Sequence, residues 1–296
     1  MSSEIKVAIL GLDTSHSVEF PKRMQAPDCP PEQKISGMRA ISCMRFETPF
    51  QNREGLDARQ KQLEAWGVMV SESFEETVKG CDAVMIEIND PSLHLEYFRR
   101  CVGLGKKIFV DKPFADNSAN ALEMRRIASD KGLSVMSCSP LRFGKGLEEA
   151  CAVVSKPSHC SFYGPLGKAP AGSSIVWYGV HACEMLQRAM GPGALGVKTL
   201  PDSSGVVLIV DYKDGRRGVV ELVEKAWHYG GTLRGEAQIA FPEDTSSIYQ
   251  RTLFQVEKFF RSGTSSVSLN DACEVTGILD AAERSFKSGK RETVIS

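Results

Sequence analysis

Residues 5–16 run Ile-Lys-Val-Ala-Ile-Leu-Gly-Leu-Asp-Thr-Ser-His. The apolar run at 5–10 predicts a buried β-strand, and Gly11 ends it with a residue suited to a tight turn. The Asp-Thr-Ser triplet that follows is made of common helix caps, so a helix is predicted to begin there and to continue through Phe20. The stretch therefore predicts a strand, a turn and a helix, which is the first unit of an open α/β fold.

Strand and helix keep alternating after this unit. Apolar runs predict further strands at 38–44, 68–70, 82–88, 106–110 and 132–137. Helical patterns separate them, at 56–66, 74–79, 118–131 and from Pro91 to about Gly103. Such alternation with short connections predicts a Rossmann-type doubly wound parallel sheet with helices on both faces.

The second half of the chain has a different texture. Runs at 204–212 and 217–223 flank an Asp-Gly step, which favours a tight antiparallel hairpin. With helices at 248–261 and 270–287, this half is predicted to be an α+β domain with a mostly antiparallel, open-faced sheet. We expect residues 1–139 and 140–296 to form the two domains. An apolar patch on the open sheet face would favour a homodimer or homotetramer.

Composition excludes several classes of partner. The formal net charge is −1 and basic residues are scattered among acidic ones, so nucleic acid is not an expected partner. The start of the chain lacks a basic segment followed by an apolar one, and apolar runs fall far short of the ~20 residues that span a bilayer. The nine cysteines are odd in number and form no C-x-x-C pair. We therefore predict a cytoplasmic protein with reduced thiols, no membrane partner and no metal site.

Lys112 is the first candidate for chemistry. It lies in Lys-Lys-Ile-Phe-Val-Asp-Lys-Pro at 106–113, directly after a predicted strand. The carboxyl ends of parallel strands border the ligand crevice, and Pro113 restricts the direction in which the chain leaves the strand. A solvated lysine in a strand-to-helix connection is the alternative.

The turn after the first strand is the candidate cofactor site. Gly11 stands where a dinucleotide fold needs a tight turn, so that backbone N–H groups meet a pyrophosphate at the helix N-terminus. Aligned on Gly11, the second and third glycines of G-x-G-x-x-G become Asp13 and His16. The Asp13 carboxylate would repel a pyrophosphate, or else turn inward and cap the helix. The predicted cofactor-binding residues of this turn are Gly11, Leu12, Asp13, Thr14, Ser15 and His16.

The end of the second strand bears on the choice of cofactor. Arg45 stands near the position of the acid that accepts the ribose hydroxyls of NAD, and an arginine there can accept the 2′-phosphate of NADP. The alternative makes Glu47 the ribose ligand and Arg45 a solvated strand end. NAD or NADP is the predicted cofactor, with a slight preference for NADP.

A histidine in the second half is the other candidate for chemistry. His181 is predicted to open an amphipathic helix, with Glu184 one turn later on the same face, where its carboxylate could orient the imidazole. A core histidine satisfied by its neighbours is the alternative.

Three motifs carry a resemblance to a known family. Asp111-Lys112-Pro113 is similar to the E-K-P motif of the Gfo/Idh/MocA-type oxidoreductases, which include glucose-fructose oxidoreductase and inositol dehydrogenase. Residues 86–94, Ile-Glu-Ile-Asn-Asp-Pro-Ser-Leu-His, resemble the family's fourth-strand signature, and residues 179–184, Gly-Val-His-Ala-Cys-Glu, resemble its G-x-H-x-x-D segment. The resemblance covers nearly the whole chain. It implies a nicotinamide-dependent dehydrogenase of a sugar, polyol or related hydroxy acid, with Asp111, Lys112 and Pro113 near the cofactor.

The chain also departs from the family. Where the family often carries an aspartate four residues before the histidine, this chain has Trp177. Together with Asp13 and His16, this keeps a second reading open, in which the scaffold is a non-catalytic ligand-binding or regulatory protein. A third reading keeps the enzyme but uses bound NAD for transient oxidation during elimination or glycoside cleavage.

The expected mechanism is oxidation of a secondary alcohol. His181 is predicted to act as general base, while the Lys112 ammonium hydrogen-bonds the same oxygen. Trp177 would form an apolar wall for a sugar ring. Further predicted contacts, each after a strand end or near the histidine, are Asn89 for the cofactor and His94, Arg142 and Glu184 for the substrate.

Overall fold

The computed structural model describes residues 4–296 and divides the chain into two compact units. Among the described residues, the first unit contains 4–111, 123–137 and 249–268, and the second contains 112–122, 138–248 and 269–296. The expected boundary at residue 139 lies beside one of these changes of unit. The division into folding domains at 1–139 and 140–296 stays a prediction.

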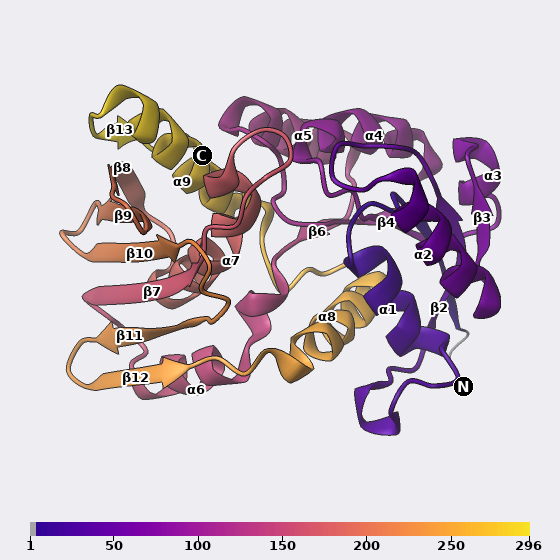
Figure 1. The fold of residues 1–296 in the computed structure, drawn as a ribbon, viewed down its shortest axis with the longest axis horizontal. Coiled ribbons are helices and arrows are strands. Elements are labelled where there is room, and N and C mark those ends of the chain that lie inside the picture. The colour runs from indigo at the N-terminus through magenta and orange to yellow at the C-terminus, as the bar shows by residue number, and fades with distance from the viewer. Residues whose placement is uncertain (1–3) are drawn as a thin grey trace. The chain divides into compact units, whose positions relative to one another are not determined.

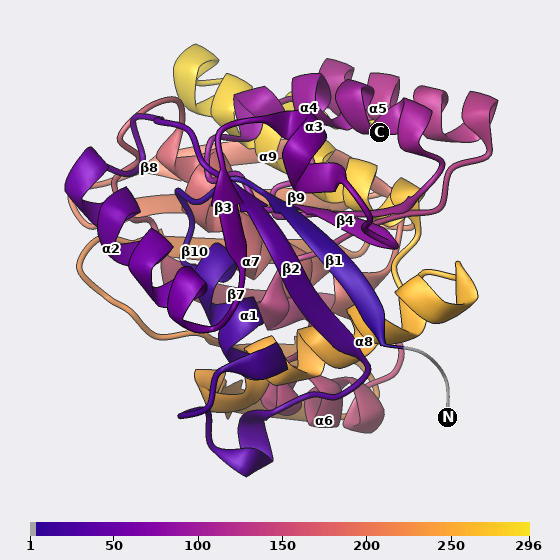
Figure 2. The same ribbon diagram turned by 90° about the vertical axis from the view of Figure 1, so that its right-hand side faces the viewer.

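The first unit is built on a six-stranded parallel sheet of order β3-β2-β1-β4-β5-β6. Its strands are β1 (Ile5–Leu10), β2 (Met38–Met44), β3 (Met69–Ser71), β4 (Ala83–Ile86), β5 (Lys107–Val110) and β6 (Val135–Ser137). The order reverses direction between β1 and β4, so the switch point at which open α/β sheets bind ligands lies there. Figure 2 shows β1 and β2 side by side in this sheet.

Helices cover both faces of the first sheet, with α1 and α8 on one side and α4 on the other (Figure 1). The helices of this part of the chain are α1 (His16–Gln25), α2 (Arg53–Ala65), α3 (Phe74–Val78), α4 (His94–Cys101), α5 (Ser118–Lys131) and α8 (Ile248–Ser262). Short 3₁₀ turns are η1 (Pro31–Gln33), η2 (Pro91–Leu93) and η3 (Val102–Leu104). Continuous apolar strands buried on both faces are what a parallel sheet requires.

Aromatic rings join α8 to α1. The His16 ring stacks on Phe20 at 5.0 Å, and Tyr249 of α8 meets His16 edge-on at 5.2 Å and Phe20 at 5.9 Å between ring centroids. Phe20 is fully buried. The late helix α8 therefore completes the packing of the first helix of the chain.

The second unit contains a seven-stranded sheet of order β12-β11-β7-β10-β9-β8-β13. Its elements are η4 (Pro140–Phe143), α6 (Lys145–Val153), β7 (His159–Pro165), α7 (Ser174–Met190), β8 (Ala194–Pro201), β9 (Gly205–Tyr212), β10 (Arg217–Val223), β11 (Gly230–Arg234), β12 (Gln238–Pro242), η5 (Thr245–Ser247), α9 (Leu269–Ser288) and β13 (Glu292–Thr293). Among the described strands of the second sheet, only β7 and β10 pair in parallel, and the predicted hairpin of β9 and β10 is confirmed.

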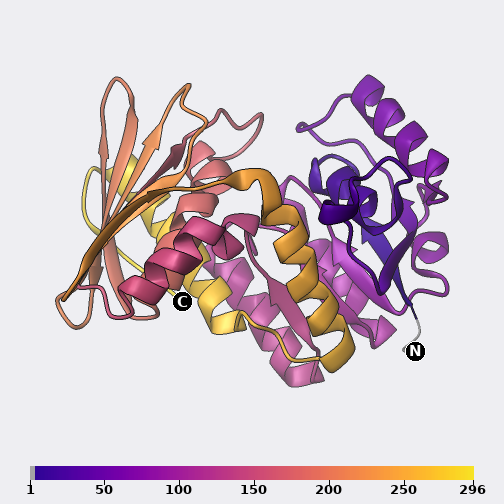
Figure 3. The same cartoon turned by 90° about the horizontal axis from the view of Figure 1, so that it is seen from below.

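The second sheet carries helices on one face. Figure 3 shows α6, α7 and α9 on one side of it, and within residues 4–296 no helix covers the other side. Along β9, every second side chain is buried while the intervening ones are partly exposed. The predicted α/β class with an open-faced, mostly antiparallel second sheet is therefore confirmed. None of the helices in the described chain combines the length and the apolar character needed to span a membrane.

Candidate active site

The β1–α1 turn requires a glycine at its first position. Gly11 has a φ of +104°, and a Cβ built on it would lie 2.3 Å from the Glu87 carbonyl oxygen. Its N–H donates to Met44 O at 3.1 Å, which extends the β1–β2 ladder into the turn. The first glycine of a dinucleotide fingerprint allows a tight turn that passes close to the neighbouring strand, and the backbone at Gly11 makes such a turn.

Asp13 turns inward rather than towards a bound anion. Its side chain is 1% exposed, Oδ1 accepts from Asn89 N–H at 2.8 Å, and Oδ2 accepts from the Thr48 hydroxyl at 2.7 Å. The carboxylate was expected to face a pyrophosphate or to cap α1, and it does neither. Burial raises the pKa of Asp13, although both hydrogen bonds favour the ionised form.

Arg59 places a positive charge beside the same turn, and the sequence analysis missed it. Its Nη1 donates to the Leu12 carbonyl at 2.9 Å, and the charge of Asp13 raises its pKa against a larger lowering by burial. The residue lies in the middle of α2, some 47 residues from Leu12 along the chain. No local pattern marks it, because its position follows from the packing of α2 beside the turn.

The start of α1 fits a dinucleotide phosphate. Ser15 is exposed and makes no side-chain cap of the helix, whereas Asp13 and His16, which replace two glycines, point inward and are nearly fully buried. Backbone N–H groups at a free helix N-terminus bind anions, and Arg59 adds charge nearby. The residues present therefore fit the pyrophosphate of NAD or NADP.

Arg45 already has two partners. Its Nη2 lies 2.5 Å from Asp57 Oδ1, and its Nη1 donates to Gln60 Oε1 at 2.6 Å. Glu47, the alternative ribose ligand, is exposed. The Asp57 side chain is about half exposed, so an incoming phosphate could compete with it for the guanidinium.

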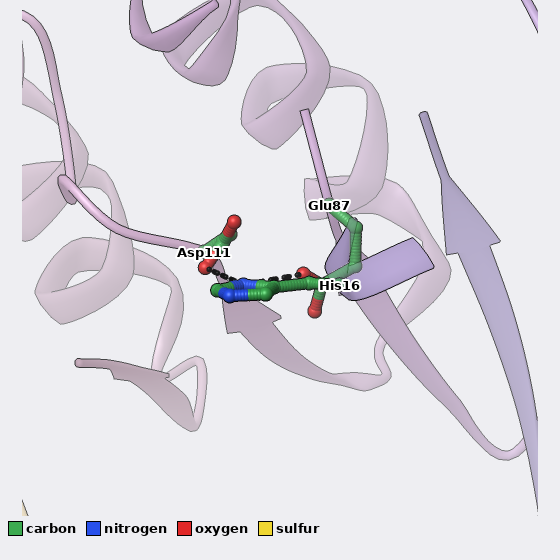
Figure 4. Close-up of side chains that lie close together, drawn as sticks. All are labelled: His16, Glu87 and Asp111. Carbon is green, nitrogen blue, oxygen red and sulfur yellow. Dashed lines mark hydrogen bonds and ion pairs between the residues drawn. The ribbon is translucent and has the colours of Figure 1, made fainter. Parts of the chain in front are cut away.

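His16, Glu87 and Asp111 meet at the carboxyl edge of the first sheet (Figure 4). His16 Nδ1 lies 2.9 Å from Asp111 Oδ1 and 3.9 Å from Glu87 Oε2. The two acids follow neighbouring strands: Ile86 pairs with Val110, and the next N–H groups, of Glu87 and Asp111, extend the ladder to Leu10 O and Ile86 O. All three side chains are buried.

Lys112 follows Asp111 and belongs to the second unit. Its side chain is 6% exposed, and its ammonium makes no hydrogen bond or ion pair with any residue in the described range 4–296. The Lys112–Pro113 peptide is cis. Because the stem of the side chain is buried and the ammonium has no protein partner in this range, the ammonium can donate hydrogen bonds to a polar ligand atom.

The sequence predicts that His181 opens a helix, but the residue lies in the middle of α7. The helix begins seven residues earlier, where the Ser173 hydroxyl accepts from Val176 N–H and caps it. His181 is 8% exposed, and its Nδ1 lies 2.7 Å from the hydroxyl oxygen of Ser139. Ser139 was not predicted as a site residue, and its position after β6, next to Pro140, was the only signal in the sequence.

Glu184 does not bond His181, contrary to the expectation that it orients the imidazole. Its Oε1 accepts from Ser139 N–H at 3.0 Å and its Oε2 from Arg142 Nη1 at 2.9 Å. Burial raises the pKa of Glu184 although Arg142 opposes the shift. The acid therefore acts on the histidine through Ser139, and Arg142 is held in a buried ion pair with it.

Aromatic rings surround His181 in the second unit. The Tyr178 ring lies 5.5 Å from the imidazole and the Tyr229 ring 5.8 Å, both edge-on. Tyr178 also contacts Trp177 at 4.8 Å and Trp227 at 5.4 Å, and Trp227 is 61% exposed. Trp177 is thus part of an aromatic group, as a ligand wall requires.

The two remaining predicted contacts have structural partners. His94 is fully buried with Nε2 2.7 Å from Ile88 O, a geometry that favours a role in the fold over contact with substrate. Asn89 donates its backbone N–H to Asp13 and its side-chain amide approaches Asp13 O at 3.5 Å. Asn89 therefore supports the cofactor turn from β4.

Comparison with known proteins bears on the fold of this chain. A model of the oxidoreductase family with an NAD-binding Rossmann fold matches residues 53–138, which include the Asp111-Lys112-Pro113 motif but not the altered glycine turn. Uncharacterized oxidoreductase YhhX of Escherichia coli is 29% identical over 111 residues. That match covers 33% of this chain and 32% of YhhX, so the chain matches about a third of its relative's length.

Solved structures share the whole fold at low identity. Scyllo-inositol dehydrogenase of Lactobacillus casei, solved with NAD(H) and scyllo-inositol, has a TM-score of 0.79 at 14% identity and covers 99% of this chain and 100% of its own. GenD2 from gentamicin A biosynthesis, solved with NAD, has a TM-score of 0.79 at 13% identity over 100% and 98%. An Agrobacterium radiobacter oxidoreductase, solved with NAD⁺, L-tartaric acid and magnesium, has a TM-score of 0.76 at 14% identity over 99% of both chains. The family match over residues 53–138 and the shared fold confirm the predicted resemblance to the Gfo/Idh/MocA-type oxidoreductases.

Proposed function

We propose that the protein is an NAD(P)-dependent dehydrogenase that transfers a hydride between the cofactor and a secondary hydroxyl group of a sugar, polyol or related small molecule. The observation that carries the proposal is the placement of Lys112, a residue only 6% exposed whose ammonium has no hydrogen-bond or ion-pair partner among residues 4–296. An oxygen that develops negative charge is the group such an ammonium stabilises best.

The cofactor would be held by the first unit. Backbone N–H groups of the turn from Gly11 to His16 would bind the pyrophosphate, with Arg59 and Asn89 supporting the turn. The bound nicotinamide would accept or donate the hydride at its C4 atom.

His181 and Lys112 would handle the proton and the charge. The His181 imidazole acts as a base through Nε2 only when its Nδ1 carries a proton, and Nδ1 can donate that proton to the Ser139 oxygen 2.7 Å away. The substrate hydroxyl would lose its proton to His181, and the Lys112 ammonium would donate a hydrogen bond to the oxygen of that hydroxyl. Ser139, Glu184 and Arg142 position this base and do not touch the reacting atoms.

The proposal also concerns the choice between NAD and NADP, which differ in the group at the 2′ position of the ribose. Arg45 favours NADP, while its pairing with Asp57 and Gln60 reduces that preference. Replacement Asp57→Asn would leave the guanidinium freer to accept a 2′-phosphate, and we expect it to raise NADP⁺ affinity relative to NAD⁺.

The substrate class rests on the aromatic group and on the neighbours. Tyr178, Tyr229 and Trp177 provide apolar surface for the C–H face of a ring. The solved neighbours include one with scyllo-inositol and one with L-tartaric acid, both polyhydroxylated. We propose a cytoplasmic homo-oligomer acting on a small polyol or hydroxy acid, with neither nucleic acid nor membrane as partner.

The rivals differ in what they predict. A non-catalytic protein would have no use for an ammonium and an imidazole buried in one unit, although Asp13, His16 and Trp177 replace residues that the family uses. An enzyme that oxidises transiently would release product without net reduction of cofactor.

The deciding experiment is calorimetric titration with NAD⁺, NADH, NADP⁺ and NADPH, followed by a turnover screen of sugar alcohols. We expect one cofactor pair to bind with a micromolar Kd. Replacement Lys112→Ala should lower turnover by about 10²-fold or more while leaving cofactor affinity and folding unchanged. Lys131→Ala, at an exposed lysine, is the matched control and should be neutral. Failure of all four cofactors to bind, or full turnover by Lys112→Ala, would refute the proposal.

A further inference from the structure

The cluster of His16, Glu87 and Asp111 does more than the proposed hydride transfer requires. The exposed fractions are 4% for His16 and 0% for Glu87 and Asp111. Two carboxylates in one buried cluster repel each other when both are ionised, and a protonated imidazole balances only one of them. A cation held between the two carboxylates and the imidazole nitrogen would offset this repulsion.

The ligand atoms lie at separations that suit a metal ion. Nδ1 of His16 and one oxygen from each acid all lie within 4.8 Å of one another. Metal bonds to imidazole nitrogen and carboxylate oxygen are about 2.0–2.2 Å long, which sets neighbouring ligand atoms about 3.0–3.5 Å apart. The observed 2.9 Å from His16 to Asp111 falls near this range, whereas the 3.9 Å from His16 to Glu87 and the separation of up to 4.8 Å between the two acids would have to shorten when an ion binds.

Position in the fold supports a site of this kind. The two acids stand one residue beyond the paired strand ends Ile86 and Val110, and His16 opens the helix that packs on the same edge. Three separate elements, β4, β5 and α1, thus deliver one ligand each. Phe20 stacks on the imidazole of His16 and Tyr249 meets it edge-on, and these contacts restrict the orientation of the ring.

We propose that His16, Glu87 and Asp111 bind a divalent transition-metal ion of the Mn²⁺ or Zn²⁺ class, in a structural role. One imidazole nitrogen with two carboxylate oxygens is a donor set that these ions accept. Near-complete burial of all three residues assigns the ion to the fold rather than to substrate. It would tie the N-terminus of α1 to the ends of β4 and β5, next to the cofactor turn.

The test uses the full chain, stripped of metal with a chelator and titrated with Mn²⁺ alone. Mn²⁺ is the probe of choice because it has little affinity for the chain's nine thiols, which would bind Zn²⁺. We expect one ion per chain by electron paramagnetic resonance and a rise in Tm on binding. Replacement Glu87→Gln, which keeps the side chain's size, should weaken Mn²⁺ binding by about 30-fold or more, and Asp111→Asn should act in the same way.

Two controls separate the site from adventitious binding. His159→Asn removes an exposed histidine and should leave the affinity unchanged, and Mg²⁺ should bind far more weakly than Mn²⁺ because one ligand is nitrogen. Absence of a one-to-one complex in the unaltered protein would overturn the proposal and leave the three groups sharing protons. Equal Mn²⁺ affinity in Glu87→Gln would overturn it as well. Both readouts are independent of dehydrogenase activity, so failure of the proposed function would not affect them.

Discussion

In the proposed mechanism, Ser139 fixes which nitrogen of His181 is basic, because its hydroxyl oxygen lies 2.7 Å from Nδ1 and would accept a hydrogen bond from Nδ1–H there. Without that partner the imidazole can rotate or adopt the tautomer that carries the proton on Nε2. We expect Ser139→Ala to lower kcat by about tenfold to a hundredfold with a smaller change in KM, and to shift the pH profile of kcat/KM. Ser139→Thr keeps the hydroxyl and should restore activity. An unaltered pH profile in Ser139→Ala would contradict the role.

Asp13 gives the stability of the protein a pH dependence of known sign. Burial raises its pKa in the folded state above the ordinary value of 3.8, so the folded chain binds more protons than the unfolded chain just above that pH. Its contribution is favourable at low pH and is lost as the pH rises through the folded pKa. Asp13→Asn keeps an oxygen that accepts from Asn89 N–H, donates to the Thr48 hydroxyl instead of accepting from it, and removes the charge. The variant should therefore gain stability relative to the unaltered protein as pH rises from 3.8. Urea denaturation at several pH values measures the difference, and a constant difference would contradict it.

The β1–α1 turn depends on the glycine at position 11. A Cβ at Gly11 would overlap the Glu87 carbonyl at 2.3 Å and would stand at a φ of +104°. We expect Gly11→Ala to cost about 3 kcal/mol or more and to abolish cofactor binding. Gly105→Ala is the matched control, because Gly105 also has a positive φ of +62° but nothing lies within 4 Å of its added Cβ. It should cost about 1–2 kcal/mol, and an equal cost for both would show that the overlap relaxes without penalty.

Element positions were predictable where periodicity and caps are local. The strands at 5–10 and 38–44 and the helix at 118–131 have the bounds that the sequence predicts. The start of α7 was misplaced because its cap, Ser173, lies in a serine-rich stretch without a distinctive pattern. Ser139, Arg59 and the Glu87–Asp111 neighbourhood could not be predicted in the same way, since each depends on strand register or helix packing between distant segments.

At the scale of the molecule, the uncovered sheet face is where we expect copies of the chain to associate. Val219 of β10 pairs with Ile209 of β9, and both are partly exposed on the face that no helix of residues 4–296 covers, while their neighbours Leu208 and Val220 are fully buried. A charge in the middle of such an apolar face opposes association. Ile209→Glu should convert an oligomer into monomers in light scattering, whereas Lys213→Glu in the hairpin turn should not. A monomeric unaltered protein would refute the expectation.

The return of the chain to its first unit through α8 limits how this protein can be divided. A fragment that stops at residue 139 would lack Tyr249, and the faces of His16 and Phe20 that Tyr249 covers would be open to water. We expect such a fragment to aggregate unless residues 249–268 are supplied through a short linker. The nucleotide-binding unit proposed for this protein is therefore not continuous in sequence. Any chimaera that uses it has to include residues 249–268 as well as the N-terminal part of the chain.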